Sequence, residues 1–187
     1  MSNSNGRATA ITVFTPIRPR LAPFNRLSFA IARQIVNPIT SKVRRLSFIH
    51  FAWWAVVRRI PFNGPPQEPE TLHSPYMVFE SNFNGEWPDY IDTFGLEIPI
   101  RMWSVWGTSF GYPGARPTSD FIRYVGVNQF PVDHFYASYP DATTKTVRAA
   151  VRLRERVAAF QRETAHVTPE QFQAAYRRLV RDSQRDL

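Results

Sequence analysis

The spacing of hydrophobic residues predicts three strands and one helix in the first part of the chain. Residues 9–17, 45–59 and 76–83 are rich in β-branched and aromatic side chains, which favour strands. Residues 24–36 instead place apolar side chains at helical spacing, namely Phe24, Leu27, Ile31 and Ile35. Both faces of the predicted strand 45–59 are apolar, so we expect both faces to be covered.

The stretch from Tyr76 to Phe94 predicts a strand that passes through a tight polar turn into a helix. Asn84-Gly85 supplies residues that tolerate a left-handed backbone. Pro88 suits the first turn of the helix that follows, where backbone amides also stabilise the negative charge of Asp89. We interpret this turn as architecture rather than as a ligand site, and expect the side chains of Asn82 and Asn84 to hydrogen-bond within the turn.

The second half of the chain is predicted to end in two helices. Residues 96–114 have an irregular pattern, and a short helix is expected at residues 119–127. Residues 133–142 suit either a last strand or an ordered aromatic loop. The two final helices cover residues 143–163 and the segment after Thr168, whose Thr-Pro-Glu-Gln sequence is typical of a capped helix start.

This order of elements predicts an α+β fold of the ferredoxin-like kind, with additional C-terminal helices. We expect a disordered N-terminus over residues 1–8, a ferredoxin-like domain over 9–142 and a helical extension over 143–187. Two options stay open for the free face of the sheet. A second copy would cover it in a dimeric α/β barrel, or the C-terminal helices would cover it within one chain.

The composition excludes several kinds of chemistry. None of the 187 residues is a cysteine, which rules out disulfides, thiolate zinc sites and a cysteine nucleophile. The histidines lack the spacing of a helical metal site, and there is neither a Gly-x-Ser-x-Gly elbow nor a phosphate-binding glycine loop. No apolar run approaches the ~20 residues needed to cross a bilayer. The lack of cysteines is compatible with a reducing cytoplasm, so we expect a cytoplasmic location, either free or at the periphery of the membrane.

Charge is distributed unevenly along the chain. Residues 1–67 contain ten basic residues and no acid, whereas residues 68–147 contain four basic residues and ten acids. The basic residues around the predicted helix 24–36 are Arg18, Arg20, Arg26, Arg33, Lys42, Arg44 and Arg45. Such a surface suits an acidic partner or the periphery of an anionic membrane, and the apolar side chains of the helix either cover the sheet or meet that membrane. The strand aromatics lack the pattern of RNA-binding sheets, so we expect no nucleic-acid partner.

Five blocks of the sequence resemble a largely uncharacterised, mostly actinobacterial protein family. They are TAITVFTPIRP, SFIHFAWWAVV, YMVFESNFNGEWPDYID, RMWSVWGTSFGYPG and PVDHFYASYPDAT, within residues 9–160. Family members typically read His-Phe-Ala-Arg where this chain has His50-Phe51-Ala52-Trp53. The resemblance implies a ferredoxin-like fold in the neighbourhood of dimeric α/β barrels, which include haem-binding dye-decolourising peroxidases and small monooxygenases.

Six residues are candidates for ligand binding: His50, Trp54, Glu80, Trp103, Trp106 and His134. The imidazole of His50 lies mid-strand on an apolar face, where it suits either a haem ligand or a core residue hydrogen-bonded to a carboxylate such as Glu80. From these observations we expect a non-catalytic binding or accessory protein without a cofactor, acting as a homodimer or within a larger assembly. The alternative is a haem- or small-molecule-binding enzyme with an aromatic pocket.

Overall fold

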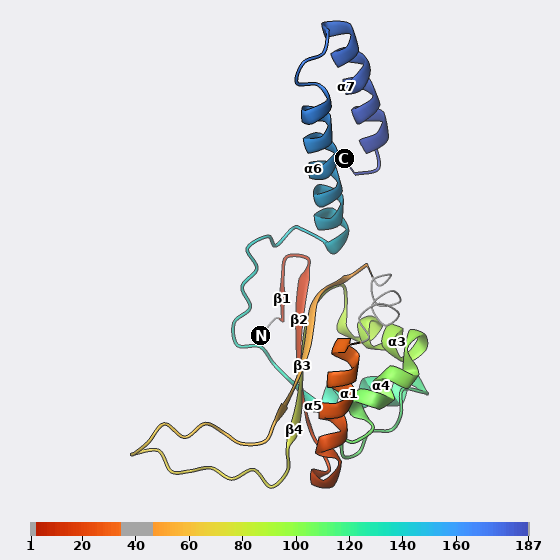
Figure 1. Cartoon of the computed structure of the whole chain (residues 1–187). Coiled ribbons are helices and arrows are strands. Elements are labelled where there is room, and N and C mark those ends of the chain that lie inside the picture. Colours follow the sequence, from red (N-terminus) through yellow and green to blue (C-terminus); the bar gives the residue numbers. More distant parts are fainter. Residues whose placement is uncertain (1–2, 35–46, 187) are drawn as a thin grey trace. The chain divides into compact units, whose positions relative to one another are not determined.

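The computed structural model describes residues 3–34 and 47–186, except the side chain of Arg33. It has an α+β fold, with an antiparallel sheet and flanking helices (Figure 1). The chain divides into two compact units, residues 1–140 and residues 141–187, and the sheet belongs to the first.

Three long strands form the sheet. The central strand β4 (Tyr76–Asn84) pairs on one side with β2 (Ala8–Pro16) and on the other with β3 (Ile49–Val57), both antiparallel. Two short strands, β1 (Ser4–Asn5) and β5 (Gln129–Phe130), pair with the other edge of β2. Residues 4–8, which the sequence predicts to be disordered, therefore form a hairpin with the sheet.

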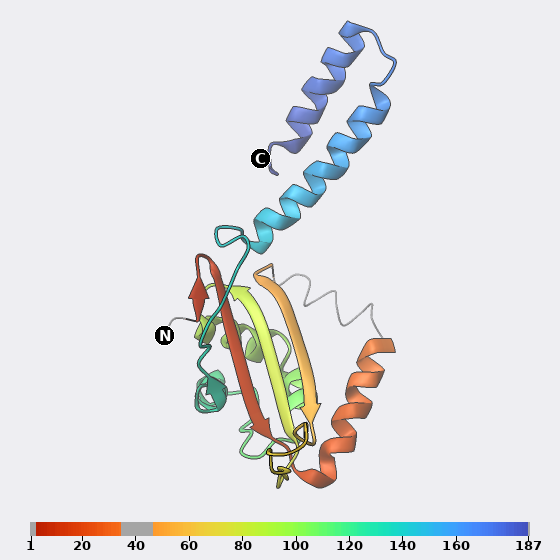
Figure 2. The same ribbon diagram turned by 90° about the vertical axis from the view of Figure 1, so that its left-hand side faces the viewer.

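Helices flank this sheet on one side, and Figure 2, viewed from the opposite side, shows the orange helix beside the edge of the sheet and the green helices behind it. The flanking helices are η1 (Pro19–Leu21), α1 (Ala22–Gln34), α3 (Trp87–Glu97), α4 (Pro99–Trp106) and α5 (Thr118–Asn128). The core between sheet and helices is strongly aromatic. Phe79 of β4 lies between Trp54 and Trp106, with ring centroids 5.1 and 5.3 Å away, and Phe121 contacts Trp106 in turn.

One segment differs from the sequence-based prediction, and a second segment decides between two predicted alternatives. Residues 99–106 form the regular helix α4, although an irregular segment was expected; Pro99 begins it, and Met102, Val105 and Trp106 bury one side of it. Residues 133–142 form a loop, and the last strand lies earlier, at Gln129–Phe130.

The predicted apolar stripe of helix α1 faces away from the sheet. Phe24, Leu27 and Ile31 are exposed, whereas Ala22 and Asn25 are buried. The side chain of Asn25 donates a hydrogen bond to Val105 O (2.9 Å) near the end of α4 and accepts one from Thr108 Oγ1 (2.5 Å). The prediction that this apolar stripe covers the sheet is therefore wrong. The predicted helix residue Ile35 lies outside the described residues.

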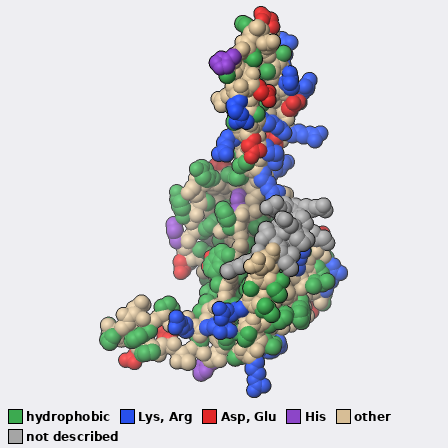
Figure 3. Space-filling model, viewed as in Figure 1, with side chains coloured by type: hydrophobic (Ala, Val, Ile, Leu, Met, Phe, Trp, Pro, Cys, Tyr) green, Lys and Arg blue, Asp and Glu red, His purple; other side chains and the backbone are tan. Residues whose placement is uncertain are grey.

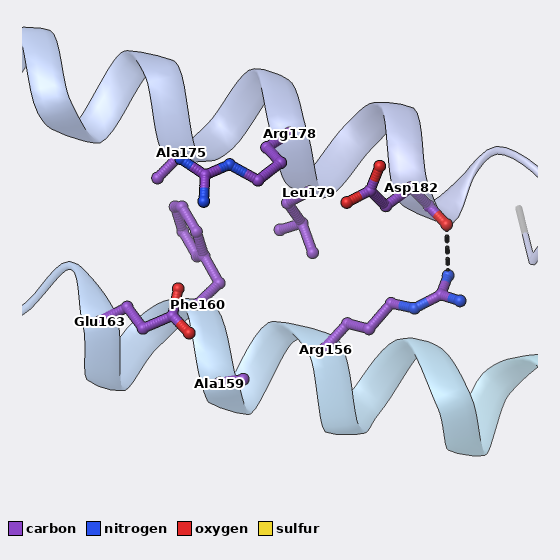
Figure 4. Close-up of a pocket in the computed structure, with 8 residues that line it drawn as sticks. All are labelled: Arg156, Ala159, Phe160, Glu163, Ala175, Arg178, Leu179 and Asp182. Carbon is purple, nitrogen blue, oxygen red and sulfur yellow. Dashed lines mark hydrogen bonds between the residues drawn. The ribbon is translucent and has the colours of Figure 1, made fainter.

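The second unit is a helical hairpin of α6 (Thr144–Glu163) and α7 (Pro169–Ser183). Thr168 and Gln171 form the capping box that the sequence predicts. The ring of Phe160 contacts Phe172 of the facing helix, with centroids 5.3 Å apart. Arg156 donates to the Asp182 carbonyl at one end of a shallow groove between the helices (Figure 4).

Near the C-terminus, Asp186 holds the two helices together by charge. Its carboxylate is nearly buried and pairs with Arg152 and Arg156, with N–O distances of 2.5 and 2.8 Å. Hydrogen bonding from Arg152 and the charge of both guanidinium groups lower the pKa of Asp186.

Candidate functional site

The candidate site is the face of the sheet that the helices of the first unit leave uncovered, here called the open face. Alternation along the strands places on it Ala10, Thr12, Phe14 and Pro16 of β2, Phe51, Trp53, Ala55 and Val57 of β3, and Tyr76, Val78, Glu80 and Asn82 of β4. The opposite side chains of β4, among them Met77 and Phe79, are fully buried under the helices. Most side chains on the open face are thus apolar, as is usual for a surface that another layer covers.

Three large aromatic side chains are exposed at this site. Phe51 is 72% exposed and Trp53 is 47% exposed, both on the edge strand β3. Phe130 of β5 is 54% exposed and lies edge-to-face against Phe14, with centroids 5.1 Å apart. Phe51 and Trp53 on β3 and Phe130 on β5 thus place exposed aromatic surface on opposite sides of this sheet face. Exposed apolar surface of this kind is typical of sites that contact another molecule.

Glu80 brings a carboxylate into the middle of the open face. The strand register places it between Thr12 of β2 and Trp53 of β3. Among the described residues it has no ion-pair partner. Glu80 therefore adds a charged hydrogen-bond acceptor to a sheet face that also carries exposed aromatic rings.

The long connection between β3 and β4 (residues 58–75), here called the arm, projects from the sheet on the side of the open face (Figure 1). The tip of the arm is held by its own hydrogen bonds. Gln67 accepts from the Asn63 amide (2.9 Å) and donates to Pro61 O (3.2 Å). Ile60 and Phe62 on the arm are exposed.

The candidate tryptophans do not line one pocket together. Trp54 and Trp106 are core residues on either side of Phe79. Trp103 points away from that core, is 56% exposed, and contacts Phe24 of α1 at 6.1 Å between ring centroids.

The candidate histidines and Glu80 are likewise separated. His50 lies where the β3–β4 register shifts between Ile49 and Phe51, and its Nε2 atom is buried without a hydrogen-bond partner among the described residues. Glu80 is on the open face and forms no hydrogen bond with His50 Nε2. His134 is exposed in the loop after β5.

The turn between β4 and α3 is built as architecture. Gly85 has a φ of 104°, which supplies the expected left-handed residue. The Asn84 side chain donates to Arg7 O (2.8 Å), so it ties the turn to the neighbouring β1–β2 hairpin. Beside the turn lies a shallow depression of about 190 Å³, lined by two carboxylates, Glu86 and Asp89, and by Tyr90.

The predicted basic surface is described in part. Arg18 donates to Gly107 O (3.4 Å) and lies over the ring of Phe110. Arg20 and Arg26 are exposed. The side chain of Arg33 and all of Lys42, Arg44 and Arg45 lie outside the described residues.

Within the described parts of the chain, no group of three or more His, Asp or Glu side chains is placed to hold a metal ion. The helices described are all too short or too polar to cross a bilayer. Comparisons with protein-family models, with curated proteins and with solved structures found no match. The open face, the arm and the basic surface are therefore the features of this chain that bear on its function.

Proposed function

We propose that this protein is a non-catalytic binding or accessory protein that acts as a homodimer through the open face of its sheet. The observation that carries the proposal is the exposure of Phe51, Trp53 and Phe130 on one sheet face. Burying such side chains contributes about 1.5–3 kcal/mol each. In an isologous interface the same surface of each copy contacts the other, so each copy would cover the exposed aromatic side chains of its partner.

The strand order supports the proposal. The described sheet has β5 and β2 on one side of β4 and β3 on the other, with all neighbours antiparallel. This order supports the proposal of a ferredoxin-like sheet, in which the first and third long strands are central. The family resemblance points to the same fold among dimeric α/β barrels, in which two such sheets face each other.

The arm gives the second copy a further contact. It reaches out beyond the open face and carries Ile60 and Phe62 exposed. An ordered projection with exposed apolar side chains is stabilised when it lies against another molecule. In the proposed dimer each arm lies against the partner's sheet edge, while the basic N-terminal region stays free for an acidic partner or an anionic membrane.

Sedimentation velocity on the full chain at micromolar concentration tests the proposal. The wild-type chain is expected to sediment as a dimer. The double variant Phe51→Thr/Trp53→Thr, which keeps β-branched residues in the strand, is expected to sediment as a monomer. Trp103→Gln removes an exposed tryptophan outside the open face and is the matched control, so it is expected to remain dimeric.

Two results would contradict the proposal. One is a wild-type chain that sediments as a monomer throughout the concentration range. The other is a Phe51→Thr/Trp53→Thr variant that dimerises as well as wild type. Thermal unfolding of each variant separates loss of the dimer from loss of the fold.

A further inference from the structure

A second apolar surface lies away from the sheet, on the outer side of α1 and α4. Five side chains form it, here called the α1–α4 ridge: Phe24, Leu27, Ile31, Ile100 and Trp103. Leu27 is 59% exposed and Ile100 is 83% exposed, while Phe24 and Trp103 touch edge-to-face. Figure 3 shows hydrophobic side chains gathered over these two helices with basic side chains near them.

The geometry of α1 fixes the direction of the ridge. Successive residues of a helix are about 100° apart, so Phe24, Leu27 and Ile31 share one side and Asn25 lies on the opposite side. Asn25 is completely buried and is hydrogen-bonded to both Val105 and Thr108. Rotating the apolar side inward would leave these buried polar groups without partners, which opposes the rotation. The ridge is thus held outward by the fold.

The charges beside the ridge have one sign. Arg20 and Arg26 are exposed, and neither forms an ion pair with a described residue. Residues 1–67 contain no acid, and α4 contains none. The acid nearest to α4 in sequence, Glu97, ends the preceding helix. An apolar ridge with arginines at its side and no carboxylate of its own matches an anionic, partly apolar partner surface.

We propose that the α1–α4 ridge docks this protein on the surface of an anionic lipid bilayer. Aliphatic and aromatic side chains of such a helix enter the boundary between headgroups and acyl chains, where Trp and Phe are favoured, and the arginines meet anionic headgroups. This inference deepens the basic-surface part of the proposed function and rests on it. The open face and the ridge use different residues, so dimerisation and lipid docking can fail independently.

Co-sedimentation with vesicles tests this docking on the full chain. The probes are vesicles of pure phosphatidylcholine and vesicles with roughly one third phosphatidylglycerol, which supplies the anionic charge. The wild-type chain is expected to bind the anionic vesicles and to bind the neutral ones far more weakly. Raising the salt concentration is expected to weaken binding without abolishing the contribution of the ridge.

Matched variants separate the two contributions. Leu27→Gln/Trp103→Gln removes apolar surface at constant net charge and is expected to lower the partition coefficient at least about tenfold. Arg20→Gln and Arg26→Gln are each expected to lower it about fivefold at low salt. The matched control is Phe51→Thr/Trp53→Thr, which also keeps the net charge. Each chain of this variant is expected to bind the anionic vesicles as the wild-type chain does.

Absence of wild-type binding to the anionic vesicles would overturn the inference, and so would binding that Leu27→Gln/Trp103→Gln leaves unchanged. Sedimentation velocity of the same samples keeps the two proposals apart. A dimer that ignores vesicles contradicts the lipid docking alone, whereas a monomer that binds vesicles contradicts the homodimer alone. Circular dichroism confirms that each variant remains folded.

Discussion

Helices α1 and α3 accompany the same sheet and both carry apolar stripes, yet they use these stripes in opposite ways. Helix α3 buries Tyr90, Ile91 and Phe94 in the core. Helix α1 buries Asn25 and exposes its stripe, including Ile31. Helical periodicity therefore predicts that a helix has an apolar side, but it does not predict what that side faces.

The neighbours of each helix explain the difference. Tyr90 of α3 stacks on Phe83 of the central strand, with ring centroids 3.9 Å apart, so its apolar side meets an aromatic surface. Helix α1 instead meets the end of α4, where the carbonyl of Val105 needs a donor. Asn25 supplies it, on the same side of α1 as Ala22 and Phe29, which pack against the core.

The largest expected effect comes from a matched pair of substitutions, Ile91→Ala and Ile31→Ala. Ile91 is 0% exposed and Ile31 is 47% exposed. Ile91→Ala is expected to lower the free energy of unfolding by about 2–5 kcal/mol, because it leaves a cavity under the sheet. Ile31→Ala is expected to change it by no more than about 0.5 kcal/mol. Urea denaturation followed by circular dichroism measures both.

A loss of stability in Ile31→Ala as large as that in Ile91→Ala would contradict the assigned difference between α1 and α3. It would mean that the outer side of α1 is covered in the isolated protein. Repeating the measurement at several protein concentrations shows whether dimerisation contributes to either value.

The second expected effect concerns the buried amide that orients α1. Asn25→Ala removes the donor to Val105 O and the acceptor of Thr108, and is expected to cost about 1–3 kcal/mol. Asn63→Ala on the exposed arm is the matched control and is expected to be neutral within about 0.5 kcal/mol. If Asn25→Ala is as neutral as the control, hydrogen bonding does not fix the direction of α1.

Much of the fold follows from the sequence, because strand composition and helix starts act locally. The strand at residues 76–83 and the capping box at Thr168 are confirmed in place. Helix α4 was missed because its eight residues are flanked by glycine- and aromatic-rich segments that hide its period. Missing α4 also hid the carbonyl that Asn25 satisfies, so the direction of α1 could not be predicted from its own residues.

The candidate site was predicted less well than the fold. Apolar character on both faces of the β3 segment indicated that its second face needs a cover, and Phe51 and Trp53 are exposed there. The sequence could not show that Trp54 and Trp106 meet across Phe79, since this contact joins three distant segments. The short strand at Phe130 also escaped prediction, because two residues carry no readable period.

The smallest expected effect comes from the loss of a hydrogen bond that Tyr90, on the apolar side of α3, makes. Tyr90 donates a hydrogen bond of 2.5 Å to Ser81 Oγ, and Ser81 in turn donates to Phe51 O. Tyr90→Phe keeps the ring but removes this donor, and is expected to cost about 0.5–1.5 kcal/mol at neutral pH. Urea denaturation again measures the difference.

Alkaline pH sharpens this prediction, because burial raises the pKa of Tyr90 above its ordinary value of 10.0. The folded state then keeps the phenol proton at a pH where the unfolded chain releases it. The stability that Tyr90 contributes is therefore fully present below pH 10 and is lost as the pH rises beyond it, by about 1.4 kcal/mol per pH unit. Burial also raises the pKa of Tyr112, to about 12, but wild type and Tyr90→Phe share that group, so it cancels. The advantage of wild type over Tyr90→Phe is expected to vanish within about one pH unit above 10. A constant advantage across this range would show that the Tyr90 hydroxyl is not buried in the way that distinguishes α3 from α1.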